Sequence, residues 1–244
     1  MKAGKIDEYT LKARAFPAFI TILPLALFLF PAIGMRSLWL GLAAPIGGTA
    51  IISFLLAQWG RDKGKLKEPK LFLLWGGKPT TIFLRHRNRE ENRIIRERRH
   101  RLLERLANGI VLPTVIAEAE DPIAADEAYE AATKVLIQRT RDKERFSLLF
   151  DELVSYGFRR NLWGLKPFGI TILVIAFVLH LSAGMFLGID RTTNFNFAVG
   201  DLVILLCWLV FVTPDWVYIT AKAYSDRLFD ALDQMVELDS NSRG

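Results

Sequence analysis

The sequence feature that most constrains the fold is a stretch, residues 156–188, in which a charged segment passes directly into an apolar run. The apolar part, 167–188, contains one titratable side chain, His180. A helix rises about 1.5 Å per residue, so a run of about 20 residues spans the roughly 30 Å hydrocarbon core of a bilayer. The basic residues that precede the run are Arg159, Arg160 and Lys166. The stretch therefore predicts a membrane helix joined directly to a polar domain.

Three further apolar runs lie at residues 16–33, 38–59 and 197–216. Hydrophobic residues make up 51% of the chain and its mean hydropathy is positive, which is rare for a soluble chain of this length. The runs predict an all-α, polytopic membrane protein with four transmembrane helices in two hairpins and a helical cytoplasmic domain. The predicted parts are an N-terminal segment and hairpin (1–59), a basic domain (60–166), a second hairpin (167–216) and a C-terminal amphipathic or coiled-coil helix (217–244).

The distribution of basic residues predicts the orientation in the membrane. Arginine and lysine are concentrated in the polar domain, whereas the two short loops between spans carry only Arg36 and Arg191 as bases. Because basic flanks of membrane helices stay in the cytoplasm, we expect the polar domain and both termini on the cytoplasmic side.

Capping signals divide the polar domain into helices. A basic helix is predicted over residues 90–106. Asp121 followed by Pro122 is typical of a helix start, with an N-cap carboxylate and a proline in the first turn. A short helix is predicted over residues 146–156, ending before Gly157. The domain is therefore expected to be helical and large enough to bury a small core.

The C-terminal segment has a helical apolar pattern from residue 216 to about residue 238. Its apolar positions alternate in steps of four and three: Val217, Ala221, Tyr224, Leu228, Ala231, Met235 and Leu238. This spacing is typical of a coiled coil, and equally of an amphipathic helix that packs on the protein's own cytoplasmic domain. Both interpretations are open at this point.

The sequence contains no arrangement of residues typical of catalysis. The segment 76–80 resembles a phosphate-binding loop, but it lacks the spacing of that motif and a proline follows Lys78. A Gly-Gly-Lys turn is still suited to hold an anion with backbone N–H groups. His86 and His100 have no cysteine nearby to complete a zinc site. We therefore predict no enzymatic activity, no metal and no cofactor.

The basic run over residues 63–101 has two interpretations. It can face anionic lipid headgroups, where each base contributes about 1 kcal/mol of attraction. It can also bind nucleic acid through phosphate contacts, with Trp75, Phe83 and His86 stacking on bases.

Two polar residues interrupt the second predicted hairpin, His180 and Asp201. Ionisable side chains are unfavourable in lipid, so they usually face a protein interior or a water-filled path. The pair predicts either an interhelical hydrogen bond or a pore or proton path.

Four motifs resemble those of a group of bacterial four-pass membrane proteins, mostly of unknown function; they lie at residues 75–81, 84–87, 139–142 and 156–167. The layout also resembles the membrane effectors of the Hailong antiphage defence system. That resemblance implies an oligomeric ion channel in the bacterial inner membrane, controlled by a DNA oligomer that a neighbouring nucleotidyltransferase makes.

The residues and the resemblance together predict a homo-oligomeric channel or membrane-disrupting effector gated by an anionic nucleotide or oligonucleotide. The ligand is expected to bind near Lys78, Arg85, Arg87, Arg96 and Arg99. The response would pass through residues 159–166 to the spans that carry His180 and Asp201. The alternative is a non-conducting membrane scaffold that recruits nucleic acid or a protein through its basic face.

Overall fold

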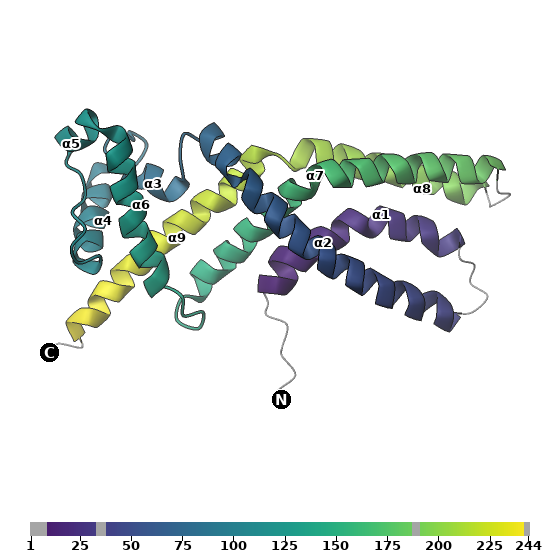
Figure 1. Ribbon diagram of the computed structural model, residues 1–244, viewed down its shortest axis with the longest axis horizontal. Helices are drawn as coiled ribbons and strands as arrows, with labels where there is room; N and C mark the ends of the chain where they lie inside the picture. Colours follow the sequence, from purple (N-terminus) through teal and green to yellow (C-terminus); the bar gives the residue numbers. More distant parts are fainter. Residues whose placement is uncertain (1–8, 33–37, 187–190, 242–244) are drawn as a thin grey trace. The chain divides into compact units, whose positions relative to one another are not determined.

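The structure is a computed structural model that describes residues 9–32, 38–186 and 191–241, without the side chains of residues 26–53, 56, 184–186 and 236–241. Every regular element in these ranges is a helix, so the all-α prediction is confirmed. The elements (Figure 1) are a π-helical turn, Thr10–Ala15, and α1 (Phe16–Ala32), α2 (Leu38–Leu74), α3 (Pro79–Leu84), α4 (Arg93–Leu106), α5 (Val115–Glu120), α6 (Pro122–Arg139), α7 (Ser147–Phe186), α8 (Arg191–Phe211) and α9 (Pro214–Asn241).

The chain forms two compact units. Unit 1 consists of Met1–Pro69 and Val154–Val217, and unit 2 of Lys70–Leu153 and Tyr218–Gly244. The chain passes between the units within α2, within α7 and within α9, so each crossing lies inside a helix rather than in a loop. The predicted boundaries lay where the charged residues begin and end. Helices α2 and α7 continue through these charged flanks, and most of α9 belongs to unit 2. The division into four parts stays a prediction.

Helix α7 runs without a break where two helices were predicted. The expected end of a short helix before Gly157 is wrong, because Gly157 here allows close packing instead of ending the helix. A Cβ atom at this position would lie 3.1 Å from both Ala13 Cβ and Tyr9 Oη. The helix also continues through Pro167, which is less disruptive in apolar helices whose neighbours satisfy the freed carbonyl group.

Helices α2 and α7 cross in unit 1 with their backbones in contact. A Cβ atom on Gly164 would lie 2.6 Å from the backbone nitrogen of Gly64, and one on Gly60 would lie 2.8 Å from Leu165 Cδ1. Lys67 Nζ donates a hydrogen bond to the carbonyl oxygen of Gly164, at 3.2 Å. Small residues allow helices to approach closely, and this packing holds the two helices together at the predicted membrane boundary.

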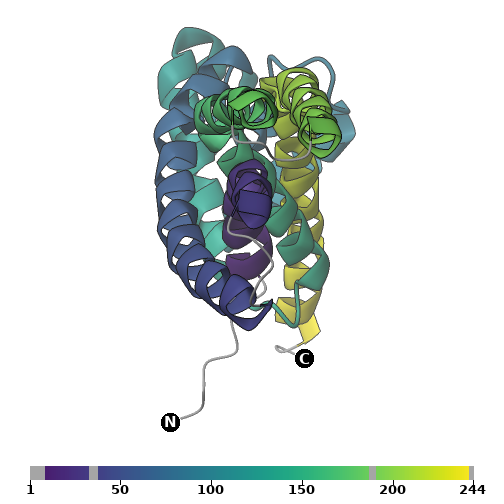
Figure 2. The same ribbon diagram turned by 90° about the vertical axis from the view of Figure 1, so that its right-hand side faces the viewer.

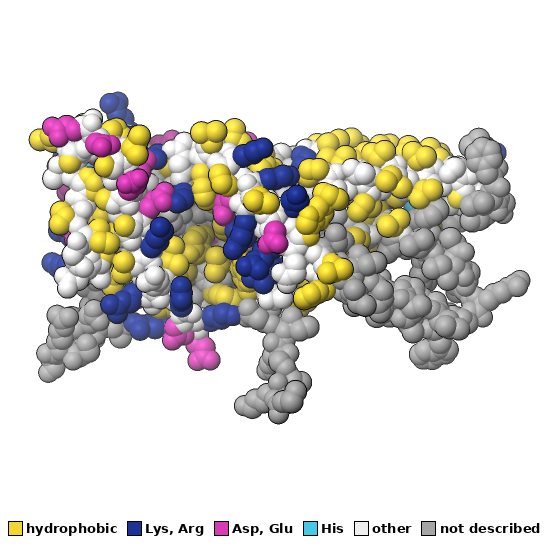
Figure 3. Space-filling view, in the orientation of Figure 1, with side chains coloured by type: hydrophobic (Ala, Val, Ile, Leu, Met, Phe, Trp, Pro, Cys, Tyr) yellow, Lys and Arg dark blue, Asp and Glu magenta, His cyan; other side chains and the backbone are white. Residues whose placement is uncertain are grey.

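Two helices of the described part are long and apolar enough to cross a membrane, by length and composition: α7, over Ser147–Ala183, and α8. They lie side by side in unit 1 (Figure 2). Hydrophobic side chains cover their visible surface (Figure 3). The large apolar residues exposed on α7 and α8 include Val174, Ile175, Val178, Leu202, Val203, Leu206 and Val210. An apolar surface of this extent favours contact with lipid. The four-span layout stays a prediction.

Unit 2 has a hydrophobic core to which α9 contributes. Leu228, Phe229 and Leu232 of α9 pack with Phe83, Leu84 and Leu103. Of the predicted apolar seam, Leu228 and Ala231 lie in this core, and Tyr224 and Met235 pack against it. The C-terminal helix therefore packs on its own unit, as one of the two alternatives expected; the side chain of Leu238 lies outside the described residues.

The capping predictions in unit 2 are largely correct. Asp121 caps α6, because its Oδ1 accepts hydrogen bonds from the backbone nitrogens of Ile123 and Ala124 at 3.1 and 3.0 Å. The basic helix α4 begins three residues later than predicted, since Asn92 is its N-cap and accepts from Ile94 N at 2.8 Å.

Candidate functional site

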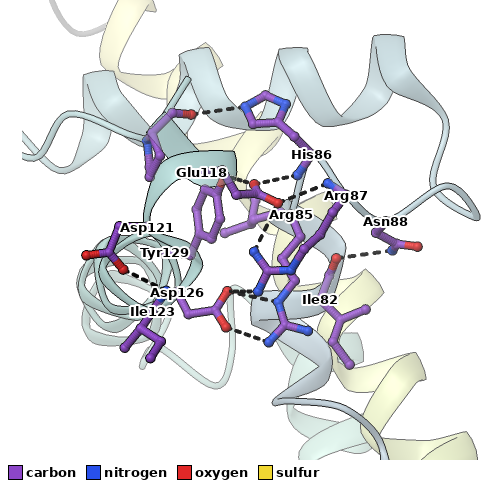
Figure 4. A network of polar contacts seen from close by, with 12 residues as sticks. Ile82, Arg85, His86, Arg87, Asn88, Glu118, Asp121, Ile123, Asp126 and Tyr129 are labelled. Atoms are coloured by element: carbon purple, nitrogen blue, oxygen red, sulfur yellow. Dashed lines mark hydrogen bonds and ion pairs between the residues drawn. The ribbon is translucent and has the colours of Figure 1, made fainter. Parts of the chain in front are cut away.

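The segment that follows α3 presents two arginines to the helices α5 and α6. Phe83 and Leu84, at the end of α3, are buried in the core and fix the start of the segment. Arg85 then has an extended backbone, with φ −63° and ψ 130°. His86 and Arg87 then form a turn, which the hydrogen bond from Asn88 N to the carbonyl oxygen of Arg85 closes at 3.2 Å. The turn brings the side chains of Arg85 and Arg87 to the same neighbour, Asp126 of α6 (Figure 4).

The two guanidinium groups converge on the carboxylate of Asp126 in α6. Arg85 binds it in a bidentate manner, with Nε 2.9 Å from Oδ1 and Nη2 2.6 Å from Oδ2. Arg87 Nη2 lies 2.8 Å from the same Oδ1. We call Arg85, Arg87 and Asp126 the arginine clamp (Figure 4). Paired guanidinium groups of this kind bind carboxylates and phosphates with the same geometry.

Glu118 of α5 fixes the backbone of the clamp segment. Its carboxylate is 3% exposed and accepts hydrogen bonds from His86 N at 2.7 Å, Arg87 N and Arg87 Nη1 at 3.0 Å, and Tyr129 Oη at 2.6 Å. Burial raises the pKa of Glu118, but these hydrogen bonds outweigh it, so the pKa is lowered and the side chain stays ionised. Burial, followed by the bond to Glu118, raises the pKa of Tyr129.

Arg85 also connects the clamp to the turn after α2. Its Nη1 donates to the carbonyl oxygen of Gly76 at 2.6 Å. Gly76 has φ +77° and Gly77 has φ +146°, conformations that glycine adopts without strain. Lys78, the cation of this predicted anion-binding turn, pairs with Glu130 of α6.

The other two predicted ligand-binding arginines make their contacts away from the clamp. Arg96 is 7% exposed and its Nη1 donates to the carbonyl oxygen of Asn88 at 2.8 Å. Arg99 pairs with Glu91 at 3.0 Å and with Asp226 of α9 at 3.6 Å. Burial raises the pKa of Asp226, and Arg99 partly opposes this effect. Of the five predicted ligand-binding cations, Arg85 and Arg87 thus share a partner, whereas Lys78, Arg96 and Arg99 each contact other groups.

Internal carboxylates therefore neutralise most of the predicted ligand site. Lys78, Arg85, Arg87 and Arg99 each pair with at least one carboxylate of unit 2. Asp126 and Glu118, the partners of the two clamp arginines, were not among the predicted site residues. A single sequence gives no signal for these pairs, because the partners are distant in the chain and meet only when α5 and α6 pack.

In unit 1 the three bases that precede the apolar part of α7 also have protein acceptors. Arg159 Nη1 donates to the carbonyl oxygen of Trp216 at 2.8 Å. Arg160 pairs with Glu68 at 3.0 Å. Lys166 Nζ donates to the carbonyl oxygens of Leu209 and Val212 at 3.2 and 2.8 Å. These contacts join α7 to α2, to α8 and to the start of α9 within the unit.

His180 of α7 and Asp201 of α8 form a buried pair in unit 1. The distance from Nδ1 to Oδ2 is 2.7 Å, and both residues are nearly inaccessible to solvent. The histidine ring also stacks on Phe197, with a centroid distance of 5.3 Å. The interhelical hydrogen bond expected from the sequence is present, whereas the pore or proton path remains a prediction.

Comparisons of the chain with protein-family models, with curated proteins and with solved structures find no match. Among the described residues, no group of three or more His, Cys, Asp or Glu side chains is placed to hold a metal ion. A functional proposal therefore has to rest on the contacts within the chain itself. Among these, the arginine clamp has the chemistry to bind an anion.

Proposed function

We propose that this protein is a four-span membrane protein of the bacterial inner membrane, with both termini in the cytoplasm. It acts as an oligomeric channel or membrane-disrupting effector that an anionic nucleotide or oligonucleotide controls. The observation that carries the proposal is the convergence of Arg85 and Arg87 on one carboxylate. A phosphate group accepts hydrogen bonds from two guanidinium groups in the same manner. Asp126 therefore holds the place that a phosphate of the ligand would take.

Displacement of Asp126 would change the contacts of the clamp with two helices. Asp126 belongs to α6, and Arg85 also bonds to Gly76, which follows the end of α2. A phosphate on the clamp would release α6 while it held the turn after α2. The chain passes from unit 2 to unit 1 inside α2, α7 and α9, and we propose that these helices carry the change to the predicted spans.

The membrane part of the proposal is supported by the two apolar helices and their polar pair. Helices α7 and α8 have the length and composition of spans, and the His180–Asp201 pair is of a kind that marks functional positions in membrane proteins. The resemblance to Hailong effectors adds the role in antiphage defence, with a DNA oligomer from a neighbouring nucleotidyltransferase as the ligand.

The substitution Asp126→Asn tests the ligand site. The asparagine keeps the shape of the side chain but removes the charge that competes with the ligand. We expect short 5′-phosphorylated DNA oligomers to bind this variant about tenfold more tightly than the wild type, which corresponds to about 1.4 kcal/mol. Binding is measured by fluorescence anisotropy with the full chain in nanodiscs.

Two further variants serve as comparisons. Asp151→Asn removes an exposed carboxylate of α7 in unit 2 and should leave the affinity unchanged. Arg87→Gln removes the more exposed arginine of the clamp, with 38% of its side chain accessible, and should weaken binding. Equal affinities of the wild type, Asp126→Asn and Arg87→Gln would exclude the clamp as the ligand site.

The second candidate function is the non-conducting scaffold that recruits nucleic acid or a protein through its basic face. The observation that favours it is the internal pairing of four of the five predicted cations, which a purely structural network would also require. DNA oligomers that bind the protein without any ion flux through reconstituted membranes would support the scaffold over the channel.

A further inference from the structure

The outer face of α4 is basic and carries an exposed aliphatic residue. Spacings of four, three and four residues place these side chains in one row along the helix, which we call the basic stripe: Ile94, Arg98, Arg101 and Arg105. Ile94 is 74% exposed. Arg98 pairs with Asp233 of α9, yet 61% of its side chain remains accessible. The stripe lies opposite the side of α4 that is buried through Arg96, His100 and Leu103.

A second exposed face has the opposite charge. It covers the approach to α5, α5 itself and the start of α6, and we call it the acidic face: Val111, Val115, Ile116, Glu120, Asp121, Ile123 and Glu127. Val111 is 82% exposed and Ile123 is 75% exposed. Figure 3 shows acidic and hydrophobic side chains next to each other over α5 and the start of α6. Large aliphatic side chains gathered in this way are typical of a contact surface.

Within one chain these two faces cannot meet. Helices α4 and α6 pack against each other through their buried sides. The basic stripe and the acidic face point away from that contact, because the exposed residues of each helix lie opposite its buried ones. A pairing of the two faces therefore requires two molecules.

We infer that the basic stripe of one copy of this chain docks on the acidic face of the next copy. Contact between the two faces would bury Ile94 of the stripe against the aliphatic side chains of the acidic face, and it would pair opposite charges. An anionic lipid surface or a nucleic acid would attract the basic stripe but repel the acidic face, so neither would account for both faces. A contact between different faces is heterologous and continues from copy to copy, which produces a closed ring when the rotation allows.

The role of this ring rests on the proposed function, since a ring of copies would surround a pore. The interface itself is tested without any measurement of flux. The readout is the mass of the full chain in nanodiscs or mild detergent, measured by mass photometry.

Charge reversal provides the test. Arg101→Glu with Arg105→Glu reverses the basic stripe, and Glu120→Lys with Glu127→Lys reverses the acidic face. Each pair of substitutions is expected to convert the oligomer to monomers, because like charges then face each other. The chain with all four substitutions has two reversed and again complementary faces, so its oligomer should return. Arg141→Glu with Asp151→Lys, two exposed residues of unit 2 outside both faces, is the matched control and should keep the wild-type mass.

The variant with all four substitutions also distinguishes a lost interface from a lost fold. Three results would each overturn the inference. The wild type could be a monomer, or the Arg101→Glu, Arg105→Glu variant could keep the oligomer. The variant with all four substitutions could be helical by circular dichroism and yet monomeric. An unchanged mass with weaker binding to phosphatidylglycerol vesicles or to DNA would assign the stripe to lipid or to nucleic acid instead. An intact oligomer without ion flux would contradict the proposed function and leave this interface standing.

Discussion

Gly164→Ala is expected to destabilise unit 1 strongly. The new Cβ atom would lie 2.6 Å from the nitrogen and 2.8 Å from the Cα atom of Gly64. Both are backbone atoms, so no side-chain rotation can relieve the contact, and α2 and α7 must move apart. Overpacking usually lowers the free energy of unfolding by about 1–3 kcal/mol, and we expect a loss at or above the upper end of this range. The measurement is thermal unfolding of the purified protein in detergent, together with the fraction recovered as a single species.

The control for this substitution is Gly200→Ala in α8. A Cβ atom at Gly200 meets no atom within 4 Å. Alanine is favoured over glycine inside a helix by about 1 kcal/mol, so this variant should be as stable as the wild type or slightly more so. If the two glycine variants had the same stability, the close crossing of α2 and α7 would be wrong.

Glu68→Leu is expected to have an effect at least as large. It removes the partner of Arg160, which is 7% exposed and lies 3.0 Å from the glutamate oxygen Oε1. Tyr156 Oη donates to the same oxygen at 2.5 Å and would also lose its acceptor. A buried charge without its partner lowers the free energy of unfolding by about 3–5 kcal/mol. The loss should appear as a lower unfolding temperature in detergent and as greater sensitivity to proteolysis.

The double variant Glu68→Leu with Arg160→Met separates lost pairing from lost packing. Replacing both members of a buried ion pair with apolar residues of similar size is often nearly neutral. The double variant should therefore be more stable than Glu68→Leu alone. Additive losses would mean that Glu68 and Arg160 contribute independently, which the observed contact does not allow.

The helices of this fold could largely be predicted from local signals, whereas the packing contacts between helices could not. Asp121 and Pro122 mark the start of α6 as expected, because the N-cap depends on neighbouring residues alone. The prediction that a helix ends before Gly157 is wrong because the role of this residue depends on distant neighbours. Whether a glycine ends a helix or admits a neighbouring helix depends on Ala13 and Tyr9, which are remote in the sequence.

The candidate site could be predicted only in part. Its cations are visible as a basic run, and the two arginines two residues apart are a local feature. Their pairing with Asp126 and Glu118 depends on the packing of α5 and α6 against the segment after α3. The sequence therefore predicts an anion-binding surface, and in the structure an internal carboxylate, that of Asp126, contacts two of its arginines.

We propose that an anion bound to unit 2 controls ion passage through the membrane. Potassium flux from proteoliposomes that contain the wild-type chain tests it most directly, before and after addition of short 5′-phosphorylated DNA oligomers. We expect a flux above that of protein-free liposomes in one of the two states. The oligomers should change it about tenfold, as expected for a coupling free energy of about 1.4 kcal/mol. Flux equal to that of protein-free liposomes in both states would mean that the protein is not an anion-controlled channel.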